Sequence, residues 1–206
     1  IGIMSGTSLD GLDICLVRIE QSIQLLGTHF VPMPDSLKAE LLALCSPADN
    51  EIVRLSLAEQ AWAKLAAEGT HTLLAQQQLH AEDIQAIGSH GQTIRHHPEL
   101  GFSLQIGAPA LLAELTGIRV ISHFRQRDIA AHGQGAPLVP AFHEWLFQAK
   151  EYCTAVVNIG GFSNVTFLQE NQPTLGFDCG PGNALLDAWI QHSLHQPYDA
   201  GGQWGA

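Results

Sequence analysis

Residues 1–11, Ile1-Gly2-Ile3-Met4-Ser5-Gly6-Thr7-Ser8-Leu9-Asp10-Gly11, are the stretch on which the fold assignment depends. A short apolar run, typical of a β-strand, leads directly into a turn of small, hydroxyl and acidic residues. Glycines in such a turn let backbone N–H groups approach an anion closely. Mg²⁺ prefers one or two carboxylates together with phosphate oxygens, so Asp10 is the candidate metal ligand. The stretch predicts a phosphate-binding loop, with an ordinary Gly/Ser/Asp turn as the alternative.

The same design returns at residues 156–168, where an apolar strand, the pair Gly160-Gly161 and an alternating strand follow one another. Two such units suggest a duplicated core in which each half contributes one phosphate loop. Asn158, Gly160 and Gly161 are then the candidates for the second phosphate-facing turn. The first turn matches neither the Walker pattern nor Gly-x-Gly-x-x-Gly. For the pair, coincidence between two glycine turns is the alternative.

The composition indicates a globular protein. Of the 206 residues, 46% are hydrophobic and 14% are charged, which is sufficient for a buried core. The net charge of −11 with nine Lys plus Arg argues against a nucleic-acid partner, which needs clustered basic residues. No apolar run reaches the roughly 18 residues of a membrane helix, and no leader opens the chain. With four scattered cysteines, these features predict a cytoplasmic protein that has no membrane partner.

Strands alternate with helices along the chain, which predicts an α/β layer fold. We expect strands at 1–4, 12–19, 23–26, 86–88, 104–106, 120–122, 156–159, 164–168 and 175–177, and helices at 36–46, 52–79, 108–116, 141–149 and 183–192. A polar turn is expected at 89–92. The start of the long second helix is open between Asp49 and Ser56, because Ser56 and Glu59 match a capping box. The helix at 141–149 marks the expected boundary between a first domain, 1–150, and a second, 151–206.

A series of longer motifs places the chain beside a known family. It comprises Ile-Met-Ser-Gly-Thr-Ser-Leu-Asp-Gly (3–11), Gly-Ser-His-Gly-Gln-Thr (88–93), Gln-Ile-Gly (105–107), Phe-Arg-Gln-Arg-Asp-Ile-Ala (124–130), Gly-Gln-Gly-Ala-Pro-Leu-Val-Pro-Ala-Phe-His (133–143), Asn-Ile-Gly-Gly (158–161) and Phe-Asp-Cys-Gly-Pro-Gly-Asn (177–183). From Ile1 to about Trp204 the chain resembles the anhydro-N-acetylmuramic acid kinases of bacterial cell-wall recycling. The resemblance implies the actin-like, ribonuclease-H-like duplicated fold, with ATP between two similar domains. Because family members are longer, it also implies that the second domain is incomplete at its C-terminus.

The resemblance implies a reaction that needs ATP and Mg²⁺. In the family, water opens the 1,6-anhydro sugar at C1 while O6 accepts the γ-phosphoryl group, which gives N-acetylmuramic acid 6-phosphate. The catalytic-base role falls on Asp178, with turn capping as the alternative. Asp178 follows a strand-like segment and precedes a Gly-Pro-Gly turn that opens a helix, so its carboxylate is expected near a helix N-terminus. The loop expected to position the phosphoryl group comprises Gly6, Thr7, Ser8, Leu9, Asp10, Gly11, Leu12 and Asp13.

A charged cluster between a strand and a glycine loop supplies the candidate sugar ligands. A guanidinium suits the lactyl carboxylate of an anhydromuramoyl sugar, so Arg125 is the preferred substrate ligand beside Asp128, with a surface salt bridge between the two as the alternative. His90 is a candidate proton shuttle or sugar hydrogen-bond partner, or else a brace for its loop.

Two departures from the family pattern bear on the substrate: His123 stands where the family has Asp, and His132 where it has Gly. A bulky side chain at a glycine position is expected to close the loop or to alter sugar contacts. Another ATP-dependent phosphotransferase or ATPase of the same fold, and an inactive truncated fragment, are the alternatives to the kinase. The resemblance is also compatible with a homodimer.

Overall fold

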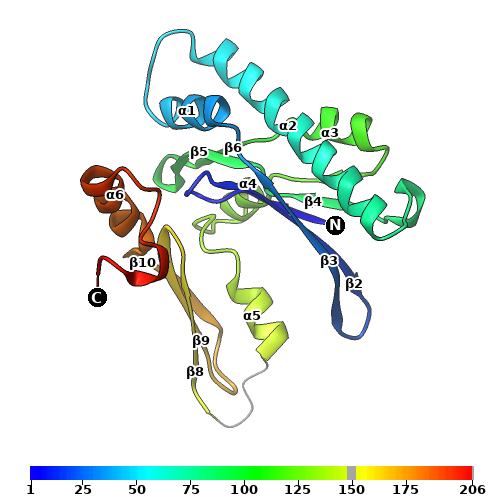
Figure 1. Ribbon diagram of the computed structural model, residues 1–206. Helices are drawn as coiled ribbons and strands as arrows, with labels where there is room; N and C mark the ends of the chain where they lie inside the picture. Colours follow the sequence, from blue (N-terminus) through cyan, green and yellow to red (C-terminus); the bar gives the residue numbers. More distant parts are fainter. Residues whose placement is uncertain (148–151, 206) are drawn as a thin grey trace. The chain divides into compact units, whose positions relative to one another are not determined.

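The computed structural model describes residues 1–147 and 152–205 (Figure 1). These residues divide into two compact units, Ile1–His132 and Gly133–Ala206. The domain boundary expected at residues 150 and 151 lies outside the described residues.

The first unit is built on a mixed five-stranded sheet of order β3-β2-β1-β4-β7. Its strands are β1 (Gly2–Met4), β2 (Gly11–Ile19), β3 (Ile23–Pro32), β4 (Ile87–Ser89) and β7 (Val120–Ile121). A separate two-stranded sheet pairs β5 (Gln92–His97) with β6 (Phe102–Ile106). The helices are α1 (Asp35–Leu44), α2 (Glu51–Gln76), α3 (Pro109–Thr116) and α4 (Phe124–Ala130). Strand β1 pairs antiparallel with β2 and parallel with β4, so the N-terminal strand is central to the sheet.

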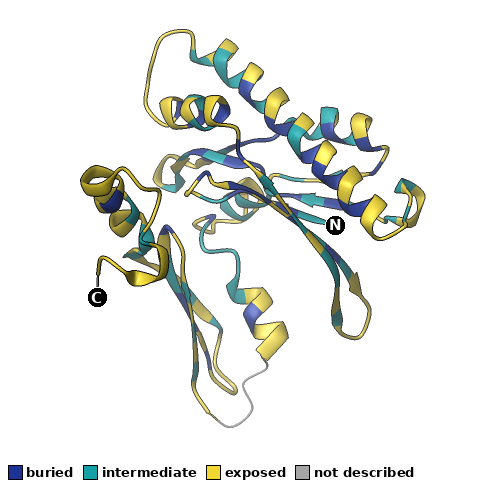
Figure 2. Cartoon of the chain, viewed as in Figure 1, coloured by how far each residue is buried: buried dark blue, intermediate teal, exposed yellow. Residues whose placement is uncertain are grey.

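The core of the first unit lies between its sheet and helix α2 (Figure 2). Along β2 the side chains alternate as a half-buried strand requires, with Leu12 and Ile14 buried and Asp13 between them exposed. Trp62 and Ala66 of α2 are completely buried against this face. The exposed Asp13 therefore lies on the opposite face of the sheet, near the first glycine turn.

Several boundaries in the first unit differ from those expected. Helix α2 begins at Glu51 after Asn50, whose left-handed backbone supplies no side-chain cap. Ser56 lies inside the helix, where its hydroxyl donates to the Ile52 carbonyl at 2.8 Å, so the expected capping box is wrong. Strand β3 continues to Pro32 because it pairs with the whole of β2. The polar turn expected to end near residue 92 leads into strand β5, and residues 124–130 form helix α4.

The second unit contains a three-stranded antiparallel sheet of order β10-β9-β8. Its strands are β8 (Thr154–Ile159), β9 (Phe162–Leu168) and β10 (Leu175–Pro181), and its helices are α5 (Pro140–Phe147) and α6 (Asn183–Leu194). The α5 helix fits the expected 141–149 segment as far as residue 147, and its last two expected residues lie outside the described ranges. It packs on β9, where the buried His143 Nδ1 lies 2.9 Å from the Thr166 hydroxyl.

Both of the predicted units in which a glycine turn joins two strands are confirmed. The first is the antiparallel pair β1–β2, and the second is the antiparallel pair β8–β9. The four cysteines, at positions 15, 45, 153 and 179, are free thiols. Within residues 1–147 and 152–205, no helix combines the length and apolar character that a bilayer span needs.

Candidate functional site

The first glycine turn is a tight bend between the antiparallel strands β1 and β2. The Leu9 N–H donates to the Gly6 carbonyl at 3.3 Å, and this bond closes the turn around Thr7 and Ser8. Leu9 has a left-handed backbone (φ 51°) and a side chain that is only 3% exposed, so it anchors the bend in the core. Thr7 and Ser8 are exposed at the corner of the bend. The turn therefore presents two hydroxyl groups and its outer backbone to solvent.

The glycines at positions 6 and 11 are present in this turn for different physical reasons. A Cβ at Gly11 would collide with the Phe30 ring and the Val31 carbonyl, so packing requires glycine there. A Cβ at Gly6 would meet no atom within 4 Å, and the Gly6 backbone lies outside the left-handed region. The fold thus does not require glycine at position 6. The open space beside the half-buried Gly6 is what the close approach of a phosphate needs.

The other loop residues named from the sequence divide between core and surface. Leu9 and Leu12 are buried, so only their backbone groups are available to a ligand. Asp10 and Asp13 are exposed, and the Asp10 carbonyl accepts a hydrogen bond from the Met33 N–H at 2.9 Å. Among the described residues no three His, Cys, Asp or Glu side chains gather as a metal cluster. A single carboxylate at Asp10 still fits Mg²⁺, which takes its other ligands from phosphates and water.

His90 and Arg125, both candidate sugar ligands, are joined by a hydrogen bond. His90 follows β4, and its backbone N–H donates to the Ile3 carbonyl at 3.0 Å, which continues the β1–β4 pairing. The His90 ring Nδ1 lies 2.7 Å from the Gly91 carbonyl, and Arg125 Nε donates to His90 Nε2 at 2.9 Å. Burial lowers the pKa of His90 below its ordinary 6.5, the Gly91 hydrogen bond opposes this shift, and the charge of Arg125 adds to it. Because both ring nitrogens are engaged, this geometry favours the bracing alternative for His90.

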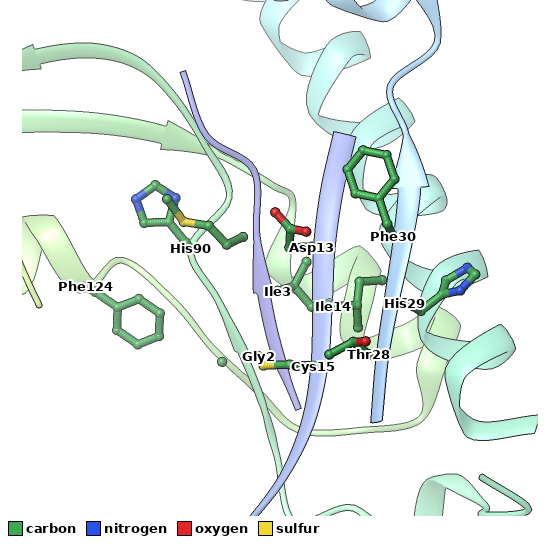
Figure 3. Close-up of a pocket in the computed structure, with 12 residues that line it drawn as sticks. Gly2, Ile3, Asp13, Ile14, Cys15, Thr28, His29, Phe30, His90 and Phe124 are labelled. Carbon is green, nitrogen blue, oxygen red and sulfur yellow. The ribbon is translucent and has the colours of Figure 1, made fainter. Parts of the chain in front are cut away.

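A trough of about 470 Å³ lies on the sheet face away from α2 (Figure 3). Gly2 and Gly88 are directly paired on neighbouring strands, and their missing side chains leave the floor of the trough open. Cys15, Phe30 and Phe124 provide apolar walls, and the lining also includes Asp13 and His90. Sequence reasoning missed this trough because its lining comes from four separate strands and one helix.

Helix α4 carries Arg125 and Asp128, both half-buried, and begins after His123. His123 and His132 have left-handed backbones, with φ of 61° and 69°. That conformation explains why glycine suits position 132, because a side chain there costs about 1 kcal/mol. The side chains of both histidines are exposed.

The second glycine turn caps a helix within its own unit. Gly182 N–H donates to the Gly161 carbonyl and Asn183 N–H to the Gly160 carbonyl, both at 2.8 Å. Gly160 N–H in turn donates to the Phe162 carbonyl at 3.2 Å. The turn and the N-terminus of α6 therefore form one hydrogen-bonded assembly, because the carbonyls satisfy N–H groups that a helix leaves unpaired. A Cβ at Gly160 would make only an ordinary contact, so the fold does not require glycine there either.

Asp178 is part of strand β10. The sequence had indicated instead that Asp178 comes after the end of this strand. The β10–β9 pairing continues to Pro181 because a bulge between Asp178 and Gly180 absorbs the irregular glycine segment. Asp178 lies opposite Asn164, which in turn lies opposite Asn158. Residues directly opposite in an antiparallel sheet share one face, so the three polar side chains form a row across the sheet.

Asn164 is the member of this row that sequence reasoning did not single out. Its side-chain oxygen accepts a hydrogen bond from Asn158 Nδ2 at 3.0 Å. A signal was present, because Asn164 follows the glycine turn by the interval that antiparallel pairing needs to oppose Asn158. Asp178 itself is exposed, so its carboxylate is open to a ligand.

Comparisons with known proteins agree with the motifs. The model of the family described as anhydro-N-acetylmuramic acid kinase matches residues 1–206. Relatives with that name are 62% identical in Pseudomonas fluorescens, 60% in Pseudomonas putida and 54% in Bordetella petrii. Each alignment includes 100% of this chain and 57%, 57% and 55% of the relative, so the chain spans little more than half the length of these relatives. With a family model matched over its whole length, the chain belongs to the anhydro-N-acetylmuramic acid kinase family.

Proposed function

We propose that this chain serves the ATP-dependent opening and phosphorylation of 1,6-anhydro-N-acetylmuramic acid to N-acetylmuramic acid 6-phosphate. Family membership supplies the substrate and the reaction class. The structural observation that carries the proposal is the open approach to Gly6 beside the exposed Thr7, Ser8 and Asp10. A kinase needs such a site, because phosphoryl transfer depends on positioning and charge stabilisation more than on covalent chemistry.

The fold that we infer is the actin-like, ribonuclease-H-like duplication, with domains at 1–150 and 151–206 and the second incomplete. Its support is that each unit contains an antiparallel hairpin with a glycine-bearing turn, β1–β2 and β8–β9. In this fold Asn158, Gly160 and Gly161 provide the second phosphate-facing surface.

The residues of the first turn fit a nucleotide phosphate with Mg²⁺. The outer backbone at Gly6 and the hydroxyls of Thr7 and Ser8 donate hydrogen bonds to phosphate oxygens, as in other anion-binding turns. Asp10 would hold Mg²⁺ directly or through water, and the ion would supply charge neutralisation for the transferred group. The side chains of Leu9 and Leu12 are buried and keep the turn rigid, while the backbone groups of both residues are available to the phosphate.

Asp178 acts as the general base in this proposal. It takes a proton from water as the water oxygen bonds to C1, the C1–O6 bond breaks, and O6 accepts the γ-phosphoryl group. The products are the 6-phosphate and ADP, so one water molecule and one phosphoryl group enter the sugar. Arg125 pairs with the lactyl carboxylate, and His90 and Asp128 lie on the same substrate side.

The test uses the product of the complete reading frame that contains this chain, with ATP, Mg²⁺ and the anhydro sugar in ¹⁸O-labelled water. We expect N-acetylmuramic acid 6-phosphate with one ¹⁸O at C1, seen by mass spectrometry, and no product from Asp178→Asn. ADP without sugar phosphate would favour an ATPase instead, and no turnover would favour an inactive protein.

The proposed partner is the small anhydro sugar, without nucleic acid or membrane. The acidic composition supports this assignment, since nine Lys plus Arg give little basis for a polyanion surface. A cytoplasmic location suits an enzyme that consumes ATP. A homodimer is inferred from the family resemblance, and light scattering of the purified protein tests it.

A further inference from the structure

A chain of two hydrogen bonds runs from the Gly91 carbonyl through the His90 ring to Arg125. We propose that His90 is a positioning residue: the Gly91 carbonyl sets its tautomer, and its Nε2 then orients the Arg125 guanidinium for the carboxylate of the sugar. This inference rests on the proposed function for the role of Arg125. It assigns His90 no direct contact with the substrate.

The tautomer follows from the hydrogen-bond partners. A carbonyl oxygen only accepts, so His90 Nδ1, at 2.7 Å from the Gly91 carbonyl, must carry a proton. A guanidinium only donates, so His90 Nε2, at 2.9 Å from Arg125 Nε, must present its lone pair. Only the neutral ring with its proton on Nδ1 satisfies both partners. An imidazolium would direct an N–H at the guanidinium, which is repulsive.

The Gly91 carbonyl is held in place by a backbone that favours glycine. Gly91 has a φ of 73°, and a Cβ there would collide with the Ile106 carbonyl. The next residue, Gln92, pairs with Ile106 in the β5–β6 sheet, which fixes this close approach. On its other side, His90 is held to β1 by its backbone bond to Ile3. The ring is therefore constrained by backbone on both sides before it meets Arg125.

The hydrogen bond to His90 also selects the way in which Arg125 receives a carboxylate. A guanidinium has two bidentate edges, one formed by Nη1 and Nη2 and one that includes Nε. His90 occupies Nε, so a carboxylate that pairs bidentately must use the Nη1–Nη2 edge. Losing His90 would remove the hydrogen bond that fixes Arg125 Nε, and sugar affinity would fall although no sugar contact is removed.

A double-mutant cycle tests this mechanism in the product of the complete reading frame. The variants are His90→Phe, Arg125→Ala and their combination, with KM for the anhydro sugar measured at saturating ATP. We expect Arg125→Ala to raise this KM about 10- to 100-fold, as for a lost charged hydrogen-bond pair. His90→Phe should raise it about tenfold and leave the KM for ATP within about twofold. In the Arg125→Ala background, His90→Phe should change the sugar KM by less than about twofold.

Matched variants separate positioning from general damage. His90→Gln should recover most of the sugar affinity, because its amide oxygen accepts from Arg125 Nε. His71→Phe, on the exposed side of α2, is the control and should behave as wild type. An equal effect of His90→Phe in both backgrounds would show that His90 meets the sugar itself and would overturn the proposal. Normal sugar KM in His90→Phe would overturn it as well.

An activity-independent measurement distinguishes failure of this inference from failure of the proposed function. Absence of sugar phosphate from the wild-type protein would refute the proposed function alone. In ¹⁵N NMR at pH 7, the His90 ring should carry its proton on Nδ1, and the Nε2 resonance should move in Arg125→Ala. A ring protonated on Nε2, or on both nitrogens, would refute the positioning mechanism whatever the activity.

Discussion

Replacing Gly6 with alanine separates a glycine kept for a ligand from one kept for the fold. A Cβ at Gly6 meets no atom within 4 Å, and the backbone there is not left-handed. The folded protein therefore accepts the methyl group without strain. Alanine also reduces the conformational entropy of the unfolded chain, so the free energy of unfolding should stay the same or rise by about 0.4–1 kcal/mol.

The affinity for the nucleotide should change in the opposite direction and fall in Gly6→Ala. The methyl group would occupy the open space through which a phosphate approaches the turn backbone. Loss of one hydrogen bond to a charged group costs about 1.5–3 kcal/mol, which weakens binding about 10- to 150-fold. Gly6→Ala should therefore raise the Kd of a non-hydrolysable Mg·ATP analogue by that factor, measured by isothermal titration calorimetry beside urea denaturation.

Gly11→Ala provides the matched contrast within the same turn. Its Cβ would collide with the Phe30 ring and the Val31 carbonyl, so its main effect should be a loss of stability, by about 1–3 kcal/mol. An unchanged Kd for the nucleotide analogue in a folded Gly6→Ala protein would refute the argument that position 6 faces a phosphate.

Three further outcomes are expected. Gly91→Ala should lower the free energy of unfolding by about 2–4 kcal/mol, because a left-handed backbone and an overlap with the Ile106 carbonyl add up; an unchanged urea midpoint would contradict this. Asp178→Asn should lower kcat about 10²- to 10⁴-fold with little change in ATP affinity, and unaltered turnover would remove Asp178 from the base role. Because burial lowers the pKa of His90 in the folded state, the unfolded state binds the proton more tightly. The His90 contribution to stability should be complete above about pH 6.5 and decline as the pH falls toward the folded pKa. Between pH 7 and pH 5, the free energy of unfolding from urea titrations should therefore fall less in His90→Gln than in the wild type. Equal declines in the two proteins would count against this role of His90.

Local patterns in the sequence predicted much of the architecture. The glycine turns between alternating apolar strands predicted both hairpins. Helix α3 ends at Thr116 as expected, and the next residue, Gly117, has a φ of 68°. Strand β5 was missed because its residues, Gln92–His97, are mostly polar, and its pairing with β6 is a tertiary contact. The first residue of α2, Glu51, lies inside the interval expected for its start, Asp49 to Ser56. The capping box at Ser56 was wrong because that residue lies inside the helix.

The candidate site was only partly predictable for the same reason. The exposed Thr7, Ser8 and Asp10 follow from the composition of one turn. The bond between His90 and Arg125 joins residues 35 positions apart, and no local spacing indicates it. The trough floor depends on the pairing of Gly2 with Gly88, which is set by sheet order. Such contacts become visible only when the strands are assembled.

The most direct test of the account is a crystal structure of the complete reading-frame product with Mg²⁺ and a non-hydrolysable ATP analogue. We predict phosphate oxygens within hydrogen-bond distance of the Gly6–Ser8 backbone, and Mg²⁺ bound by Asp10 directly or through one water. Nucleotide phosphates bound away from the turn between β1 and β2 would contradict the account.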